Sequence, residues 1–152
     1  MVLWIGRRRK DAFEELAAEY RQRLERFASV RDLVLKPAPG EGLERLVAEA
    51  DSIRGGLPDP CRTVVLDRRG RSESSRAFAV RINRWWEEWP HPLAFVVGSD
   101  LGIHPELRME AHRRWSLGPL TLPHALARVV VYEQLYRAFS IRSGGAYHRS
   151  GL

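Results

Sequence analysis

The clearest fold signal in the sequence is LAFVVGSDLG, residues Leu93–Gly102. The first five residues form a continuous apolar run, which is typical of a strand in the middle of a parallel sheet, where both faces are buried. Gly98 follows directly and permits a tight turn or a close approach of the backbone. Since ligands of open parallel sheets bind beyond the carboxyl ends of the strands, residues 98–102 are also part of a candidate site.

Strand-like and helix-like segments alternate on both sides of this run. Apolar or β-branched runs predict further strands at Val2–Ile5, Val30–Leu35, Arg62–Leu66 and Trp115–Leu117. Amphipathic spacing and capping residues predict helices from about Asp11 to Ala28, Leu43 to Ile53, Pro105 to Arg114 and Pro123 to Ile141. A further helix is capped by Ser72, Ser74 or Ser75 and reaches Trp89. A polar loop is expected from Asp67 to Arg71. The alternation predicts one α/β domain over residues 1–152, with a mainly parallel sheet flanked by helices.

Composition excludes several classes of protein. The chain has 152 residues, of which 44% are hydrophobic and 29% charged, as in ordinary soluble domains. No apolar run approaches the ~20 residues of a membrane-spanning helix, and no secretory leader is recognisable, so we expect a cytoplasmic protein without a membrane partner. Cys61 is the single cysteine, and the five histidines lack ligand spacing. We therefore expect no disulfide and no metal cofactor.

The charge balance favours an anionic partner. Lysine and arginine total 25 against 19 acidic residues, which gives a net charge of +6. Such an excess is typical of proteins that contact the phosphates of nucleic acids. Only Lys10 and Lys36 are lysines. A GC-rich genome would explain why nearly all basic residues are arginine rather than lysine. Composition alone therefore does not decide between a genomic bias and a nucleic-acid partner.

Three segments follow predicted strands and should meet at one edge of the sheet. They are Leu66-Asp67, Gly98-Ser99-Asp100, and Gly118-Pro119-Leu120-Thr121-Leu122. The third is unusually apolar for a loop, since loops normally run over the surface. An adenine ring in an apolar sleeve would explain it, and so would burial in the core or against another subunit. Neither the Gly-x-Gly-x-x-Gly fingerprint nor a Walker loop is present, which argues against dinucleotide oxidoreductases and P-loop enzymes.

Order and spacing of several motifs give a family resemblance. The motifs are Val65-Leu66-Asp67, Phe95-Val96-Val97-Gly98, Trp115-Ser116-Leu117, Leu120-Thr121-Leu122-Pro123-His124, Arg128-Val129, Glu133-Gln134-Leu135-Tyr136-Arg137-Ala138 and Tyr147-His148-Arg149. Together they resemble the bacterial ribosomal RNA large subunit methyltransferase H family, the pseudouridine N3-methyltransferases of the SPOUT superfamily. The sequence departs from the family at Ser99 and Asp100, where a second glycine and a later acid are usual, and at Ala146, where proline is usual.

The resemblance implies a fold and a cofactor. A C-terminal trefoil knot is expected, with knot and cofactor site within about residues 93–152, and the protein is expected to be a homodimer. The implied cofactor is S-adenosylmethionine, and the implied contacts are Leu66, Gly98, Leu117, Gly118, Pro119, Leu120, Thr121 and Leu122.

The implied reaction is methyl transfer to N3 of a pseudouridine in large-subunit ribosomal RNA, with the assembled ribosome as substrate. Candidate catalytic residues are Tyr147, His148, Arg149, His124 and Arg128. The two arginines would bind RNA phosphates or uracil carbonyls. His124 lies at the start of the long predicted helix, where it could serve binding or catalysis, and equally could cap the helix. Two alternatives stay open: a non-catalytic basic RNA- or ribosome-binding module, and a SPOUT methyltransferase that acts on transfer RNA.

Overall fold

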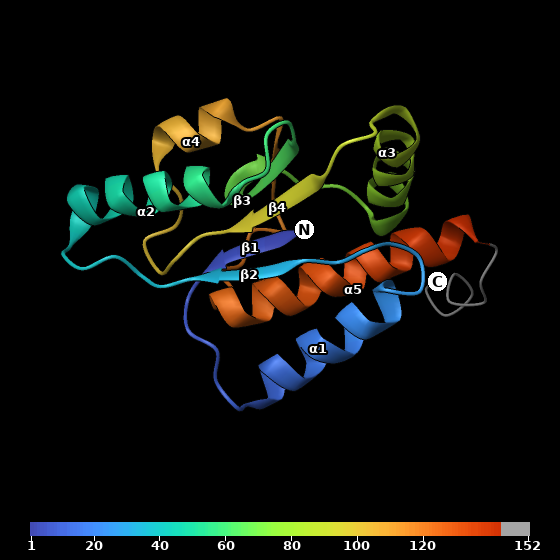
Figure 1. The fold of residues 1–152 in the computed structure, drawn as a ribbon, viewed down its shortest axis with the longest axis horizontal. Helices are drawn as coiled ribbons and strands as arrows, with labels where there is room; N and C mark the ends of the chain where they lie inside the picture. The colour runs from blue at the N-terminus through green and yellow to red at the C-terminus, as the bar shows by residue number, and fades with distance from the viewer. Residues whose placement is uncertain (144–152) are drawn as a thin grey trace.

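The computed structural model describes residues 1–143 of the chain (Figure 1). The predicted catalytic residues Tyr147, His148 and Arg149 lie outside the described residues. The strands are β1 (Val2–Ile5), β2 (Asp32–Leu35), β3 (Arg62–Arg71), β4 (Leu93–Val97) and β5 (Arg113–Trp115). The helices are α1 (Ala12–Leu24), α2 (Gly42–Gly56), α3 (Ser75–Glu88), α4 (Pro105–Glu110) and α5 (His124–Arg142). The α/β alternation is therefore confirmed.

All five strands form one parallel sheet in the order β2-β1-β4-β3-β5. The apolar run of β4 pairs with β1 on one side and with β3 on the other, so both of its faces are covered. Successive residues point to opposite faces: Phe95 belongs to one core cluster and Val96 to the other. The continuous apolar composition of residues 93–97 follows from this central position.

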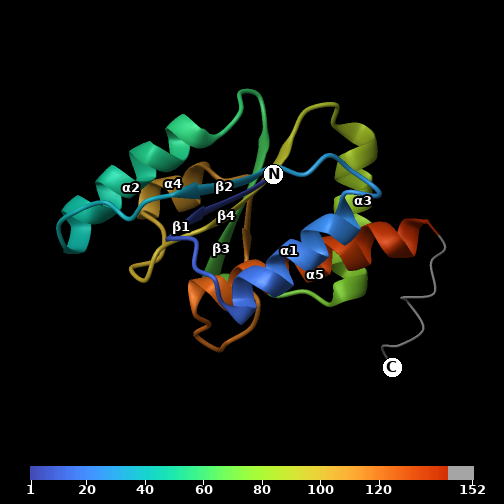
Figure 2. The ribbon, with the colours of Figure 1, turned by 60° about the horizontal axis from the view of Figure 1, so that its bottom comes forward.

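Helices cover both faces of the sheet (Figures 1 and 2). On one face, α1 and α3 both pack against α5, which lies across β1 and β4. On the other face, α2 and α4 contribute Ile53 and Leu107 to the second core cluster. Asp11 caps α1 through its side-chain oxygen. Of the three serines that could cap α3, Ser74 does so.

Four predicted boundaries were wrong, three of them near the strand β5. Away from β5, α1 ends at Leu24 rather than at Ala28. Residues 67–71 continue β3 instead of forming a loop, because β5 pairs along this edge with a register shift between Leu66 and Arg71. The predicted strand at Trp115–Leu117 begins and ends two residues earlier, and α4 ends at Glu110 rather than at Arg114. Beyond Val65, β3 no longer pairs with β4 and is held by β5 alone, so polar residues can continue this strand, and local patterning does not reveal it.

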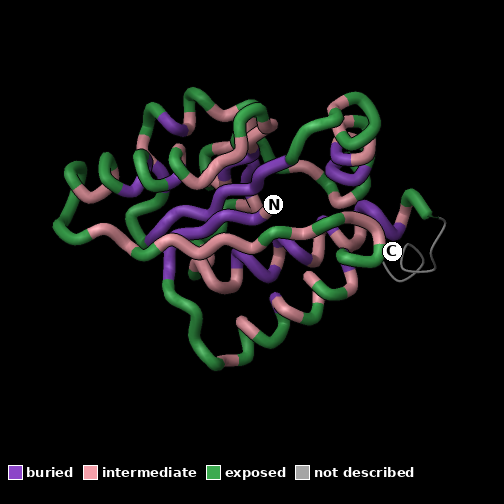
Figure 3. The backbone as a smooth tube through the Cα atoms, in the orientation of Figure 1, coloured by how far each residue is buried: buried purple, intermediate pink, exposed green. Residues whose placement is uncertain are grey.

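The apolar residues of α5 are buried within the chain itself. Val129, Val131, Leu135 and Phe139 all belong to the core beneath α1 and α3. Figure 3 shows buried stretches along the length of this helix. A partner subunit is therefore not needed to explain why apolar residues occur on several faces of this helix. Among residues 1–143, no helix is both long and apolar enough to cross a membrane, and no group of three or more His, Cys, Asp or Glu side chains is placed to hold a metal ion.

Candidate active site

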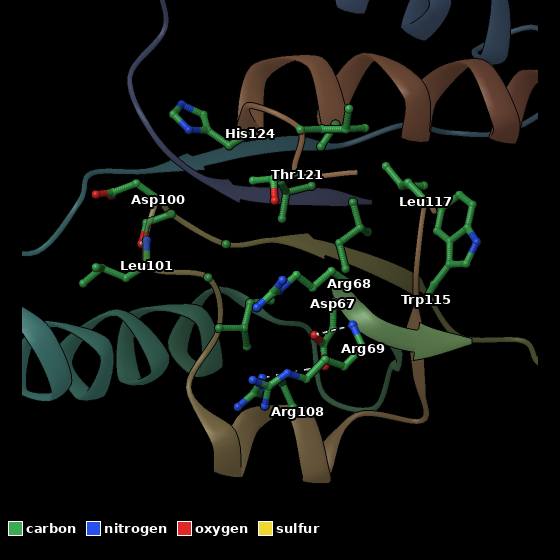
Figure 4. A pocket seen from close by; sticks show the side chains of 18 of the residues that line it. Asp67, Arg68, Arg69, Asp100, Leu101, Arg108, Trp115, Leu117, Thr121 and His124 are labelled. Carbon is green, nitrogen blue, oxygen red and sulfur yellow. Dashed lines mark hydrogen bonds and ion pairs between the residues drawn. The ribbon is translucent and has the colours of Figure 1, made fainter. Parts of the chain in front are cut away.

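A pocket of about 930 Å³ opens at the carboxyl ends of β3, β4 and β5 (Figure 4). The three segments that the sequence predicted to meet do line it together, although Leu66-Asp67 lies within β3 rather than after it. The predicted cofactor contacts that line it are Leu66, Gly98, Leu117, Gly118, Leu120, Thr121 and Leu122. Pro119 belongs to the same loop but is not a lining residue. The convergence follows from the parallel sheet, which puts the carboxyl ends of neighbouring strands at one edge.

Gly98 makes the turn after β4 possible through close packing. A Cβ atom at this position would lie 2.3 Å from the carbonyl oxygen of Gly102, so a larger residue would force the turn apart. The turn closes through the Gly102 N–H, which donates to the carbonyl of Ser99 at 2.9 Å. Gly98 is thus required by the backbone, independently of any ligand.

The same turn is attached to α2 by a buried acid. The Ser99 hydroxyl donates to Oε2 of Glu49 at 2.7 Å, and Glu49 is 2% exposed. The other oxygen of Glu49 accepts from Nε of Arg45 at 2.9 Å and from the Ala38 N–H at 3.3 Å. The buried carboxylate therefore has donors on both oxygens, as burial of a charge requires.

Arg45 links this acid to the pocket rim. Its Nη2 donates to Oδ1 of Asp100 at 2.5 Å, and this hydrogen bond lowers the pKa of Asp100. Asp100 thus balances the charge of Arg45 in this structure. Ser99 and Asp100 thus fasten this turn to α2 through Glu49 and Arg45.

The apolar loop of residues 117–122 begins with a fixed turn. The buried Ser116 hydroxyl accepts from the Gly118 N–H at 3.2 Å and donates to the Gly118 carbonyl at 3.0 Å. Gly118 has φ +121°, in a region that residues with side chains rarely adopt, and no atom lies within 4 Å of the place where its Cβ would be. Beyond the turn, Leu120 is 74% exposed. An apolar side chain thus stands at the pocket mouth without a protein partner covering it.

Asp67 gives the pocket an unsatisfied acceptor. Its side chain is only 7% exposed, and Oδ1 accepts from the Arg69 N–H at 3.0 Å. The other oxygen, Oδ2, is buried and has no hydrogen-bond partner among residues 1–143; Nη1 of Arg108 is 3.8 Å away. Burying such an oxygen is unfavourable unless a donor reaches it.

His124 and Arg128 occupy different environments although both are on α5. His124 lines the pocket and stacks on Trp4, with 6.3 Å between ring centroids. Arg128 is buried outside the pocket: Nη1 donates to Glu14 and Nη2 to Asp32, each at 2.6 Å. Its guanidinium also lies over the Trp4 ring, 4.4 Å from the centroid. The expected contact of Arg128 with RNA therefore does not fit this structure, because its charge is paired inside the chain.

Sequence reasoning missed several lining residues. Leu43 and Leu46 reach the pocket from α2, Pro105 and Arg108 from α4, and Ile103 from the segment just before α4. Leu43 is exposed, which is unusual for a leucine at a regular helical spacing, but spacing alone cannot reveal exposure. Only the order of the strands places α2 and α4 beside the carboxyl ends of β4 and β3.

Comparison with known proteins identifies the family. A family model described as predicted SPOUT methyltransferase matches residues 1–148. The chain belongs to the SPOUT methyltransferase family. A Roseobacter denitrificans relative is 42% identical and a Nitrosomonas eutropha relative 36% identical; each alignment covers 98% of this chain and 97% of the relative. Both are named ribosomal RNA large subunit methyltransferase H. The resemblance derived from the motifs is confirmed.

A solved structure supports the fold of this SPOUT methyltransferase. A probable methylase family protein from Haemophilus influenzae Rd KW20 superposes with a TM-score of 0.52, covering 94% of this chain and 67% of that one. The two sequences are 15% identical, so the likeness concerns the fold alone.

The residues of the pocket fit the cofactor of SPOUT methyltransferases, S-adenosylmethionine. Leu117, Leu120 and Leu122 supply an apolar surface suited to an adenine ring. The unpartnered Oδ2 of Asp67 is an acceptor for a hydroxyl or amino group. The space in front of Gly118 allows the loop backbone to approach a ligand closely.

Proposed function

We propose that this SPOUT methyltransferase transfers the methyl group of S-adenosylmethionine to N3 of a pseudouridine in large-subunit ribosomal RNA, on the assembled ribosome. The observation that carries the proposal is the pocket at the carboxyl edge of the sheet. It combines an apolar loop, an unpartnered buried carboxylate oxygen and a glycine turn with open space before it. The names of the relatives supply the substrate class.

The cofactor would be held by the three loops of the pocket. Leu66, Gly98 and the loop of residues 117–122, Pro119 included, are the proposed contacts, and Asp67 joins them as an acceptor. Bound S-adenosylmethionine would supply an electrophilic methyl group. The protein must then orient the target base and accept the proton that N3 releases.

Four side chains are proposed for the target nucleotide. Tyr147 and His148 are assigned to the base and Arg149 to a phosphate or a uracil carbonyl, on the strength of the family resemblance. His124 lines the pocket and has a ring nitrogen that can accept or donate a proton. Arg128 is assigned a positioning role instead, because it holds α5 against α1 and β2 through Glu14 and Asp32.

The proposal extends to assembly, knot and location. We infer a homodimer, a trefoil knot within about residues 93–152 and a cytoplasmic location, all from the family. Sedimentation at micromolar concentration should give twice the mass of the 17.5 kDa chain. A monomer mass alone would contradict the homodimer.

Methyl transfer from labelled S-adenosylmethionine to ribosomes, followed by mapping of the labelled nucleotide, tests the function. Label at N3 of one pseudouridine of large-subunit RNA is expected. Label on transfer RNA would favour the other SPOUT activity. Failure to bind S-adenosylmethionine in calorimetry would favour the non-catalytic RNA-binding module.

A further inference from the structure

A second, smaller hollow of about 430 Å³ lies beside the pocket, between the end of β3, α4 and β5. The charged residues that line it are Arg69, Arg71, Arg108, Arg113 and Arg114. No acidic residue lines it, although the protein has 19 of them. We call this feature the arginine hollow.

Gly70 builds the arginine hollow by letting β3 pass close to β5. A Cβ atom at Gly70 would lie 2.7 Å from the carbonyl oxygen of Arg114 and 2.9 Å from that of Asp67. Any side chain would therefore push the end of β3 away from β5. With glycine, Arg69 and Arg71 are held beside Arg114, in the stretch that the sequence predicted to be a loop.

The charges in the arginine hollow are only partly balanced. Arg108 faces Asp67 and Arg113 faces Glu73, each at 3.8 Å, and Glu73 also pairs with Arg81. Arg69, Arg71 and Arg114 are exposed, and none of the three has an ion pair within residues 1–143. Positive groups gathered in one concave surface attract anions and repel one another until an anion arrives.

The arginine hollow adjoins the cofactor pocket, because Arg69 and Arg108 line both. We propose that it binds phosphates of the ribosomal RNA strand next to the target nucleotide. The inference rests on the proposed function, since a nucleotide in the pocket would bring the neighbouring phosphates of its own strand to the hollow. Guanidinium groups suit this role because they bind phosphate oxygens in pairs. They bind carboxylates in the same way, so the choice of RNA over an acidic protein rests on the shared border with the cofactor pocket.

The test uses two arginines of the hollow that do not line the cofactor pocket. The double variant Arg71→Gln/Arg114→Gln removes two charges and leaves the pocket residues in place. The matched control is Arg26→Gln/Arg84→Gln, which also removes two charges. Arg26 lies just after α1 and Arg84 on α3; both are exposed and line neither cavity. Each protein is assayed for binding to S-adenosylmethionine by calorimetry and for methyl transfer to ribosomes at several salt concentrations.

We expect Arg71→Gln/Arg114→Gln to raise the KM for ribosomes about tenfold at low salt, with S-adenosylmethionine affinity and kcat at saturating ribosome unchanged. The slope of log affinity against log salt should become shallower by about 0.7 for each lost phosphate contact to single-stranded RNA. The control should behave as the wild type.

Three outcomes would overturn the proposal. The first is that Arg71→Gln/Arg114→Gln has the same KM for ribosomes and the same salt slope as the control, while the wild type methylates ribosomes. Another is weakened binding to ribosomes but unchanged binding to protein-free large-subunit RNA, which would assign the hollow to an acidic ribosomal protein. If the wild type fails to methylate ribosomes, the proposed function fails. The arginine hollow is then tested by binding of a fluorescent oligouridylate, and equal affinity of the variant and the control for this RNA would overturn the proposed phosphate site.

Discussion

The Ser99 hydroxyl donates a 2.7 Å hydrogen bond to the buried carboxylate of Glu49, which joins the turn after β4 to α2. The two residues are 50 positions apart in sequence. Gly98 in this turn lines the pocket, so the shape of the pocket depends on α2, a helix that packs against β1 and β2. Disturbing this contact should therefore affect both stability and ligand binding.

Glu49→Ala should destabilise the protein and weaken the pocket. The change leaves Arg45 and Ser99 without their buried partner, and breaking a buried ion pair costs about 3 kcal/mol. We expect urea unfolding to show a loss of that size, and calorimetry to show about a tenfold loss of S-adenosylmethionine affinity, equivalent to about 1.4 kcal/mol. Glu44→Ala, on the exposed side of the same helix, is the control and should change neither. Unchanged cofactor affinity in Glu49→Ala would show that the turn is positioned by other contacts.

Gly118→Val should reduce S-adenosylmethionine binding by more than about tenfold while the fold persists. Space is available for a side chain, so the cost comes from φ +121°, about 1–3 kcal/mol of backbone strain, and from filling room beside the apolar loop. Calorimetry measures the affinity, and circular dichroism checks the fold. Gly55→Val, at an exposed helical glycine with open space around it, serves as the control. Wild-type affinity in a folded Gly118→Val protein would mean that this loop does not contact the cofactor.

Arg128→Met should lower stability by about 1–3 kcal/mol at neutral pH, because Asp32, whose side chain is 1% exposed, loses its buried cation and keeps only the more exposed Arg8 and Arg21 and the Tyr132 hydroxyl. The effect should depend on pH. The hydrogen bond from Arg128 holds the pKa of Glu14 below its ordinary value of 4.5. A carboxyl with a lowered pKa in the folded state stabilises it above the unfolded pKa, and this contribution is lost as pH falls through the folded pKa.

The difference in unfolding free energy between wild type and Arg128→Met should therefore shrink on acidification below about pH 4.5. Urea unfolding at pH 7 and at several acidic pH values measures it. Arg84→Met, which removes a surface ion pair with Glu88, should cost less than about 1 kcal/mol at any of these pH values. A difference that stays constant with pH would mean that Glu14 does not sense Arg128.

Deleting the residues after Ala146 should abolish most catalysis and spare cofactor binding. The deletion removes Tyr147, His148 and Arg149 and leaves every pocket-lining residue among residues 1–143. Loss of acid–base groups alone costs about 10²–10⁴-fold in rate. Single-turnover methyl transfer at saturating ribosome, at two salt concentrations, measures the effect. If low salt and saturation restore the wild-type rate, these residues act only as an electrostatic aid to RNA binding.

Local sequence patterns were sufficient for the elements and for the meeting point of the pocket loops. The run Leu93–Val97 indicated a strand buried on both faces, and the alternation of elements indicated a parallel sheet. In such a sheet the carboxyl ends of neighbouring strands share one edge, so Leu66, Gly98 and Gly118 were expected together and line one pocket. These features depend on burial and periodicity, which neighbouring residues encode.

Contacts between distant charges were decided only by the tertiary structure. Arg128 pairs with Glu14, 114 positions away, and Arg71 and Arg114 meet because β5 lies beside β3. No local pattern distinguishes an arginine paired inside the chain from one that awaits a phosphate. The partner of a charge is fixed by the order of the strands and the packing of the helices, so the sequence determined which charges exist and the fold determined which of them remain free.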